Sequence, residues 1–291
     1  MTSDLAVTDP DAGAIYPFAT SPQKGAVVKL ATLSLLAALV LASPAGAVDG
    51  GVADRDRHPN VGMLGFDFDA EGDSPPFFLC SGSVLSDRAF LTAAHCIEVF
   101  GDAVQWVASL EPGGPEAPAF EPGFVFDDFP FAITAPVKRP LATVVHPRFD
   151  PETLAHDLAV LVFPKGTFDG RPIELASPNL LDRLARKHRL DARSFTLVGY
   201  GADPDLSGAE PRFFARGFRA AAVAPFLALS PRQLRLRGGA LCLGDSGSPQ
   251  FLGDSDLAVS QLSSDGEACD EIVAQRLDDP ADRGFLARFR R

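Results

Sequence analysis

Most of the chain after residue 50 consists of short apolar runs separated by Gly, Pro, Asp and Ser. Such runs are typical of β-strands, because an amphipathic helix needs a longer apolar pattern with a period of about 3.6 residues. The clearest runs occupy residues 61–66, 83–85, 89–92, 158–163, 195–199 and 257–259. Long helical patterns are rare, and no repeat of fixed period is present. The pattern predicts an all-β chain folded as a barrel or a sandwich.

One short helix is predicted close to the C-terminus. Asp279 followed by Pro280 is a typical helix start, because aspartate caps the free N–H groups of the first turn and proline fits the first helical position. Phe285, Leu286 and Phe289 would then share one face of this helix.

An apolar segment near the N-terminus predicts export. Residues 30–42 are uncharged, too short to cross a membrane as a helix, and suited to the hydrophobic part of a signal peptide. Ala45 and Ala47 follow with the small-residue spacing of a cleavage site, so we expect cleavage after Ala47 and a mature chain that begins at Val48. An uncleaved membrane anchor is the alternative. Cleavage would leave a secreted or periplasmic protein with no stable membrane association.

Two stretches fit none of these elements. Residues 1–27 are acidic and suit a signal peptide poorly, which suggests that translation starts near Val28. Residues 111–136 are rich in Pro, Gly and Phe and are expected to form a loop insertion.

Composition narrows the possible partners. The chain has 291 residues, enough to bury a sizeable core in one or two domains. Apolar residues make up 46% and charged residues 22%, which is typical of globular proteins, and the net charge is −12. Nucleic-acid binding depends on clustered Lys and Arg that neutralise phosphates. An acidic chain of this kind is therefore not expected to bind nucleic acid.

The four cysteines indicate disulfides. Cys80, Cys96, Cys242 and Cys269 include no Cys-x-x-Cys pair, so a metal or redox motif finds no support among them. An even number in an exported chain predicts two disulfides, and the sequence alone leaves the three possible pairings open. Four buried thiols are the alternative for a chain that stays in the cytosol.

Three polar side chains carry candidate chemistry. Ser246 lies in a glycine-rich turn that could expose its hydroxyl, His95 ends an apolar run and could act as a base, and Asp157 leads into a fully apolar strand. Taken singly, each has an ordinary structural explanation: a surface turn, a core histidine and a strand-capping aspartate. Together they occur in the order His, Asp, Ser, which is the order of the chymotrypsin triad.

The surrounding motifs resemble those of the trypsin-like serine proteases. TAAHC at 92–96 and GDSGSP at 244–249 match the histidine and serine motifs of that family, and HDLAVLVF at 156–163 resembles its aspartate strand. The resemblance spans residues 48–291 and points to a bacterial secreted branch. It implies an all-β fold of two packed six-stranded antiparallel β-barrels, with the active site between them and a short C-terminal helix.

The resemblance also implies a division of the chain. After residues 1–47, residues 48–165 would form the first barrel with the triad histidine and aspartate. Residues 166–291 would form the second barrel with the serine, the oxyanion hole, the substrate pocket and the C-terminal helix.

The implied function is a secreted serine endopeptidase. Ser246 would attack the scissile carbonyl, His95 would act as general base and Asp157 would orient the imidazole. The backbone N–H groups of Gly244 and Ser246 would form the oxyanion hole. A protein or peptide is the expected partner, no cofactor or metal is expected, and the chain is expected to be a monomer.

The same family pattern assigns the cysteines and the new N-terminus. Cys80 would pair with Cys96 beside the histidine, and Cys242 with Cys269 beside the substrate pocket.

A freed apolar N-terminus inserts in this family and its ammonium group pairs with the aspartate before the nucleophile. In this chain the pair would be Val48 and Asp245, with a loose terminus as the alternative.

The substrate pocket would be formed by Ala240, Ser264 and Gly266. Ala240 carries no charge at the pocket floor, which favours an apolar P1 side chain. Asp265 or a nearby acid could instead restore a basic preference. Ser248 departs from the family pattern, which has glycine at that position.

Two other classes of function compete with this interpretation. A catalytically weak or inactive homologue could act as a binding or adhesion protein on the same fold. A signal-anchored structural protein with accidental motif matches is the second, and three ordered motifs with paired cysteines disfavour it. An α/β-sheet esterase is disfavoured because no histidine follows Ser246.

Overall fold

The structure is a computed structural model that describes most of the chain after residue 51. The described residues are 52–55, 57–67, 77–98, 104–108, 138–201, 219–238, 244–265 and 271–290. They all belong to one compact unit within residues 42–291. The signal segment at 30–42 and the loop insertion at 111–136 lie outside the described residues. No helix in the described part of the chain is long and apolar enough to span a membrane.

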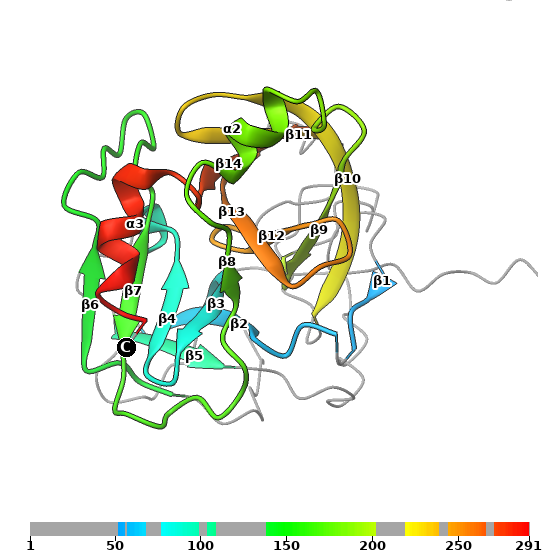
Figure 1. Ribbon diagram of the computed structural model, residues 1–291. Coiled ribbons are helices and arrows are strands. Elements are labelled where there is room, and N and C mark those ends of the chain that lie inside the picture. The colour runs from blue at the N-terminus through cyan, green and yellow to red at the C-terminus, as the bar shows by residue number, and fades with distance from the viewer. Residues whose placement is uncertain are drawn as a thin grey trace, which may run out of the picture. The chain divides into compact units, whose positions relative to one another are not determined.

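Six strands form an antiparallel sheet in the order β5-β2-β3-β4-β7-β6 (Figure 1). Their bounds are β2 Val61–Asp67, β3 Phe77–Ser86, β4 Ala89–Thr92, β5 Val104–Ala108, β6 Ala142–Val145 and β7 Ala159–Val162. β4 is buried along its whole length, and its apolar residues leave no polar face for solvent. This explains why the sequence here reads as a continuous apolar run rather than as an alternating one.

A second group of strands closes into a barrel. β10 pairs with both β9 and β11, so the order β10-β11-β14-β13-β12-β9 returns to its starting strand. The bounds are β9 Ser194–Gly199, β10 Ala220–Leu229, β11 Gln233–Arg237, β12 Pro249–Leu252, β13 Leu257–Asp265 and β14 Glu271–Arg276. Two short strands extend this sheet: β1 (Val52–Ala53) pairs with β10, and β8 (Glu174–Leu175) pairs in parallel with β13. Ring closure decides in favour of a barrel over a sandwich.

Three helices complete the described fold: α1 (Ala94–Glu98), α2 (Leu180–Ala185) and α3 (Pro280–Ala287). α3 begins as predicted, because the side chain of Asp279 accepts a hydrogen bond from the N–H of Ala281 at 2.9 Å. Phe285 and Leu286 are buried, and Phe289 packs against the same core. α1 and α2 were not predicted, because helices of five and six residues are too short to show a helical repeat.

One hydrophobic core joins the two groups of strands. It includes Val61, Leu91 and Val160 from the first group together with Val198 and Phe251 from the second. The expected all-β architecture of two packed six-stranded groups with a short C-terminal helix is confirmed, and within the described residues ring closure is seen in the second group. The division of domains at residue 165 stays a prediction, since β1 precedes the first group yet pairs within the second.

Candidate active site

Strand pairing brings the candidate histidine and aspartate together. Thr92, the last residue of β4, pairs with Ala159, the first residue of β7. The chain passes from β4 almost directly into α1, whose second residue is His95, while Asp157 lies two residues before β7. Two residues that are 62 positions apart in the sequence therefore meet at one end of the same strand pair.

Both oxygens of the Asp157 carboxylate bind His95. Oδ2 lies 2.8 Å from the ring Nδ1, and Oδ1 accepts the backbone N–H at 2.9 Å. The aspartate side chain is fully buried, whereas the histidine side chain is 22% exposed. Because a carboxylate accepts at Nδ1, the ring carries its proton there and presents Nε2 as a base.

A tight turn holds Ser246 against strand β3. Gly244 and Gly247 have φ values of 95° and 81°, which favour glycine. A Cβ on Gly247 would lie 2.5 Å from both the carbonyl oxygen of Ser81 and the hydroxyl of Thr92. Ser81 fastens the turn twice, because its N–H donates to the carbonyl of Ser246 at 2.8 Å and its hydroxyl donates to the carbonyl of Gly244 at 2.9 Å.

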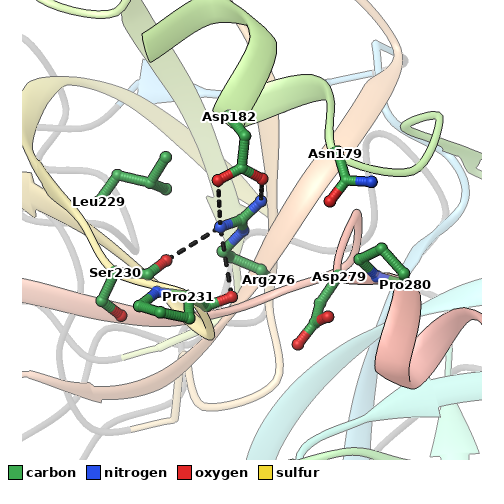
Figure 2. Close-up of a pocket in the computed structure, with 8 residues that line it drawn as sticks. All are labelled: Asn179, Asp182, Leu229, Ser230, Pro231, Arg276, Asp279 and Pro280. Atoms are coloured by element: carbon green, nitrogen blue, oxygen red, sulfur yellow. Dashed lines mark hydrogen bonds and ion pairs between the residues drawn. The ribbon is translucent and has the colours of Figure 1, made fainter. Parts of the chain in front are cut away.

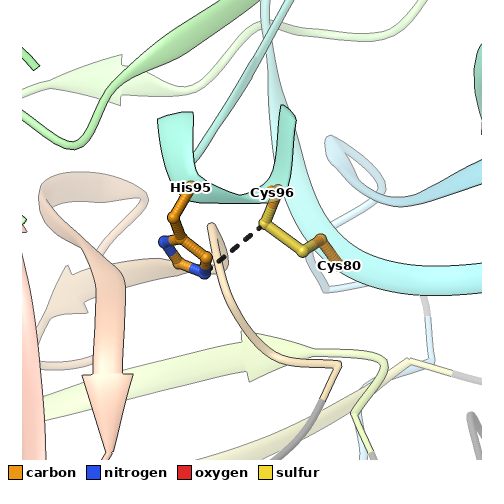
Figure 3. Close-up of side chains that lie close together, drawn as sticks. All are labelled: Cys80, His95 and Cys96. Carbon is orange, nitrogen blue, oxygen red and sulfur yellow. Dashed lines mark hydrogen bonds between the residues drawn. A yellow bond between two sulfur atoms is a disulfide. The ribbon is translucent and has the colours of Figure 1, made fainter. Parts of the chain in front are cut away.

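The serine turn and the histidine ring border the same sulfur atom. Sγ of Cys96 lies 3.7 Å from Nε2 of His95 (Figure 3) and 3.9 Å from the carbonyl oxygen of Ser246. The described hydrogen bonds include none between the Ser246 hydroxyl and His95. A nucleophile–base hydrogen bond is often long before substrate binds and tightens afterwards. The structure thus brings the three candidate residues into one region, with the final serine–histidine contact open.

The predicted disulfide between Cys80 and Cys96 is present. It joins β3 to α1, directly beside His95. These three residues bring potential metal-ligand atoms within 4.8 Å of one another, but sulfurs in a disulfide are not the thiolates that bind zinc. The second expected pair, Cys242 with Cys269, lies outside the described residues.

Comparison with known proteins identifies structures of similar fold. No protein-family model and no curated protein sequence matches the chain. HL collagenase is similar in structure, with a TM-score of 0.58, 19% identity and coverage of 83% of this chain and 98% of that one. GrC has a TM-score of 0.58 and 17% identity, with coverage of 83% of this chain and 99% of that one. Human heparin binding protein has a TM-score of 0.59 and 15% identity, with coverage of 83% of this chain and 96% of that one. The chain has the chymotrypsin fold. At these identities the likeness concerns the fold alone.

Within this fold, the candidate oxyanion hole lies in the serine turn. The N–H groups of Gly247 and Ser248 are engaged by the carbonyls of Leu262 and Asp245. By contrast, no hydrogen bond among the described residues occupies the N–H groups of Gly244 or Ser246. These two N–H groups are the ones predicted to form the oxyanion hole, and that role stays a prediction.

Asp245, within the same turn, is fully buried. Its Oδ1 accepts the N–H of Gly201 at 2.9 Å. A side chain at Gly199 or Gly201 would collide with this carboxylate, so both glycines make room for it. The expected partner, Val48, lies outside the described residues, and the ion pair therefore stays a prediction.

The expected substrate pocket falls mostly outside the described residues. Ala240 and Gly266 are both outside them, while Ser264 is half-buried near the end of β13. Ser248, which replaces the glycine of the family motif, is fully buried, and its hydroxyl has no hydrogen-bond partner in the described structure. The polarity of the pocket stays a prediction.

A cavity of about 350 Å³ lies elsewhere on the chymotrypsin fold, between α2, β14 and the start of α3 (Figure 2). Arg276 points into it and is bound by Asp182 and Asp278 and by the carbonyls of Ser230 and Pro231. Burial lowers the pKa of Arg276, but the two carboxylates raise it above the ordinary value. The guanidinium is thus fully used in holding α2 to the barrel, and we assign it a structural role.

Sequence reasoning missed three buried residues around Asp157: His156, Gln261 and Asp282. His156 stands in the aspartate motif, in which only Asp157 was expected to carry chemistry. Asp282 reads as an ordinary acid in the first turn of a helix, where it suits the helix dipole. Gln261 is one of several polar residues in a strand of mixed composition, Leu257–Asp265. Only the fold shows what these side chains contact.

Proposed function

We propose that the chain is a secreted serine endopeptidase that cleaves peptide bonds through an acyl-enzyme intermediate. The observation that carries this proposal is the two-point attachment of His95 to the buried Asp157, at 2.8 and 2.9 Å, beside the turn that holds Ser246. A strand-capping aspartate would need only one such bond. Two bonds fix both the position and the tautomer of the ring.

In the proposed first half-reaction, the Ser246 hydroxyl attacks the scissile carbonyl carbon while its proton passes to Nε2 of His95. The carboxylate of Asp157 stabilises the resulting imidazolium. The carbonyl oxygen becomes an oxyanion that the N–H groups of Gly244 and Ser246 would bind, each donor contributing about 3 kcal/mol in the transition state.

The intermediate then collapses. The C–N bond breaks, and the proton on His95 moves to the leaving amine, which leaves an ester on Ser246. In the second half-reaction the same imidazole removes a proton from water, which attacks the ester carbonyl. Release of the carboxylic acid returns the proton to the serine oxygen.

Three finer aspects belong to the same proposal. Secretion is supported by the Cys80–Cys96 disulfide, because disulfides persist in oxidising compartments, and by the expected signal segment at 30–42. An apolar P1 preference is supported by the uncharged Ala240. A protein or peptide substrate follows from the chemistry.

A binding protein on the same fold is the second candidate. The observation in its favour is that the Ser246 hydroxyl makes no hydrogen bond to His95 among the described residues. One structural neighbour, human heparin binding protein, has a name that points to binding. A net charge of −12 does not favour a polyanionic ligand for this chain.

Covalent labelling separates the two candidates. We expect the exported, purified chain to react with a fluorophosphonate probe and to lose this reaction in Ser246→Ala, while the Tm stays unchanged. Ser255→Ala is the matched control, because Ser255 is an exposed serine in a turn. This variant should react with the probe like the wild type. A folded wild-type chain that does not label, or a Ser246→Ala variant that does, would contradict the endopeptidase proposal.

A further inference from the structure

The residue before Asp157 is held by the C-terminal helix. His156 is buried, and its φ is 57°, a left-handed backbone that is uncommon outside glycine. Its Nδ1 lies 2.6 Å from Oδ1 of Asp282, a fully buried residue of α3. This contact ties the backbone directly before Asp157 to an element that lies 126 residues away in the sequence.

Asp282 is itself fixed by further donors. The side-chain N–H of Gln275 donates to its Oδ2 at 2.9 Å. Nitrogen atoms of Arg148 and His146 each lie 3.5 Å from its Oδ1, and the rings of His146 and His156 stack at 4.9 Å. Since the carboxylate is surrounded by donors and faces a guanidinium, we interpret the group as a hydrogen-bonded anchor and not as a metal site.

Gln261 holds the other side of Asp157. Its side-chain nitrogen donates to the carbonyl of Asp157 at 2.8 Å and to the carbonyl of Thr92, just before α1, at 2.9 Å. Gln261 is 1% exposed and pairs directly with Gln275 across β13 and β14. Residues opposed in an antiparallel pair share a face, so the two glutamines lie side by side.

Asp157 lies at the centre of a three-residue turn. The N–H of Leu158 donates to the carbonyl of His156 at 2.7 Å, which is the i to i+2 bond of a γ-turn. The direction of the Asp157 side chain therefore depends on a tight backbone turn. The first residue of the turn is bound by Asp282, and its second is bound by Gln261.

We propose that His156, Asp282 and Gln261 are positioning residues that aim the Asp157 carboxylate at His95. The inference rests on the proposed endopeptidase function. None of the three touches the reacting atoms. They fix the turn on both sides, so that one carboxylate oxygen meets the imidazole Nδ1 and the other meets the histidine N–H. A displacement of about 1 Å in such a group can lower the rate by about 100-fold.

The test compares two variants of α3 in the full exported chain. Asp282→Asn removes the charge that holds His156. Asp279→Ala is the matched control, because it removes the helix N-cap three residues away without touching the turn. We expect Asp282→Asn to lower kcat by about 10- to 100-fold with little change in KM. In the profile of kcat/KM against pH, the acid limb of this variant should also move to lower pH. The reason is that a misaligned Asp157 carboxylate stabilises the His95 imidazolium less. Asp279→Ala should lower the Tm only.

His156→Asn provides a second route if Asp282→Asn fails to fold, because asparagine tolerates the left-handed backbone. We expect the same loss of kcat and the same shift of the acid limb. Wild-type pH profiles and kcat in the folded variant, or equal losses in the Asp279→Ala control, would overturn the positioning role while leaving the protease function in place. A folded wild-type chain that neither labels nor cleaves peptides would overturn both.

Discussion

At the scale of single residues, buried polar side chains fix the elements around the candidate site. His146 is 4% exposed, accepts the N–H of Arg148 at its Nδ1 and faces Asp282 through Nε2. Burial, followed by electrostatic interactions with His156 and Arg148, lowers its pKa from 6.5 to about 4. A neutral imidazole is thus part of the anchor that holds the C-terminal helix.

This shift predicts a loss of stability in mild acid. Between pH 6.5 and about pH 4 the unfolded chain protonates His146 while the folded chain does not, so the free energy of unfolding falls as the pH is lowered. We expect this one group to account for a loss of about 2 kcal/mol between pH 7 and pH 5. Urea unfolding of the wild type and of His146→Gln at the two pH values measures it.

The His146→Gln variant should be less stable than the wild type at pH 7. Its free energy of unfolding should change less between pH 7 and pH 5. His188→Asn is the control, because the His188 side chain is exposed. Its backbone is left-handed, with φ of 50°, a conformation that asparagine tolerates. It should keep the wild-type dependence on pH. An unchanged dependence in His146→Gln would contradict the assignment.

At the scale of elements, the short strand β1 depends on a buried ion pair. It has only two residues, but Asp54 directly after it binds Nε of Arg219 at 2.7 Å and the His58 Nδ1 at 2.5 Å. Arg219 also donates to the carbonyl of Val61. Burial raises the pKa of Asp54, but the hydrogen bonds and charges of His58 and Arg219 lower it below the ordinary value. The ion pair fixes a segment that two ladder residues alone would hold weakly.

We expect Arg219→Met to lower the free energy of unfolding by about 3–5 kcal/mol, because it leaves Asp54 buried without its guanidinium partner. The double variant Asp54→Asn, Arg219→Met should recover part of the loss. Arg235→Met, which breaks an exposed pair with Glu271, is the control and should change stability little. Denaturant unfolding measures all three, and equal effects of Arg219→Met and Arg235→Met would contradict the expectation.

At the scale of the whole described unit, polar contacts across the two groups of strands place the serine turn. Ser81 of β3 donates its hydroxyl to the carbonyl of Gly244 and accepts the N–H of Tyr200 at 3.0 Å. It thereby joins the first sheet to both the serine turn and the end of β9. Each of the two groups of strands supplies part of the candidate site, and neither could complete it alone.

Ser81→Ala should therefore affect both stability and reaction. Loss of the hydroxyl leaves the Tyr200 N–H and the Gly244 carbonyl without this partner, at a cost of about 1–3 kcal/mol, and loosens the serine turn. Fluorophosphonate labelling should slow in the folded variant. Ser86→Ala is the matched control, because this serine lies buried in the same strand and its hydroxyl has no hydrogen-bond partner in the described structure. Identical behaviour of the two variants would contradict the role of Ser81.

Local sequence determined much of the architecture. Short apolar runs between turn residues predicted β-strands at 61–66 and 158–163, where β2 and β7 are found. The Asp279–Pro280 start of α3 depends on one side chain and its next two neighbours. Such features are readable because their physical causes act within a few residues.

The tertiary structure decided which polar residues meet. Gln261 contacts Asp157, and Asp282 contacts His156, across 104 and 126 residues of chain. Strand register and helix docking set these contacts, and neither is encoded in the spacing between the partners. The sequence could offer the histidine, aspartate and serine as candidates from their motifs. Burial and hydrogen-bond partners exist only once the two groups of strands have packed together, and these explain how an aspartate is held in the interior.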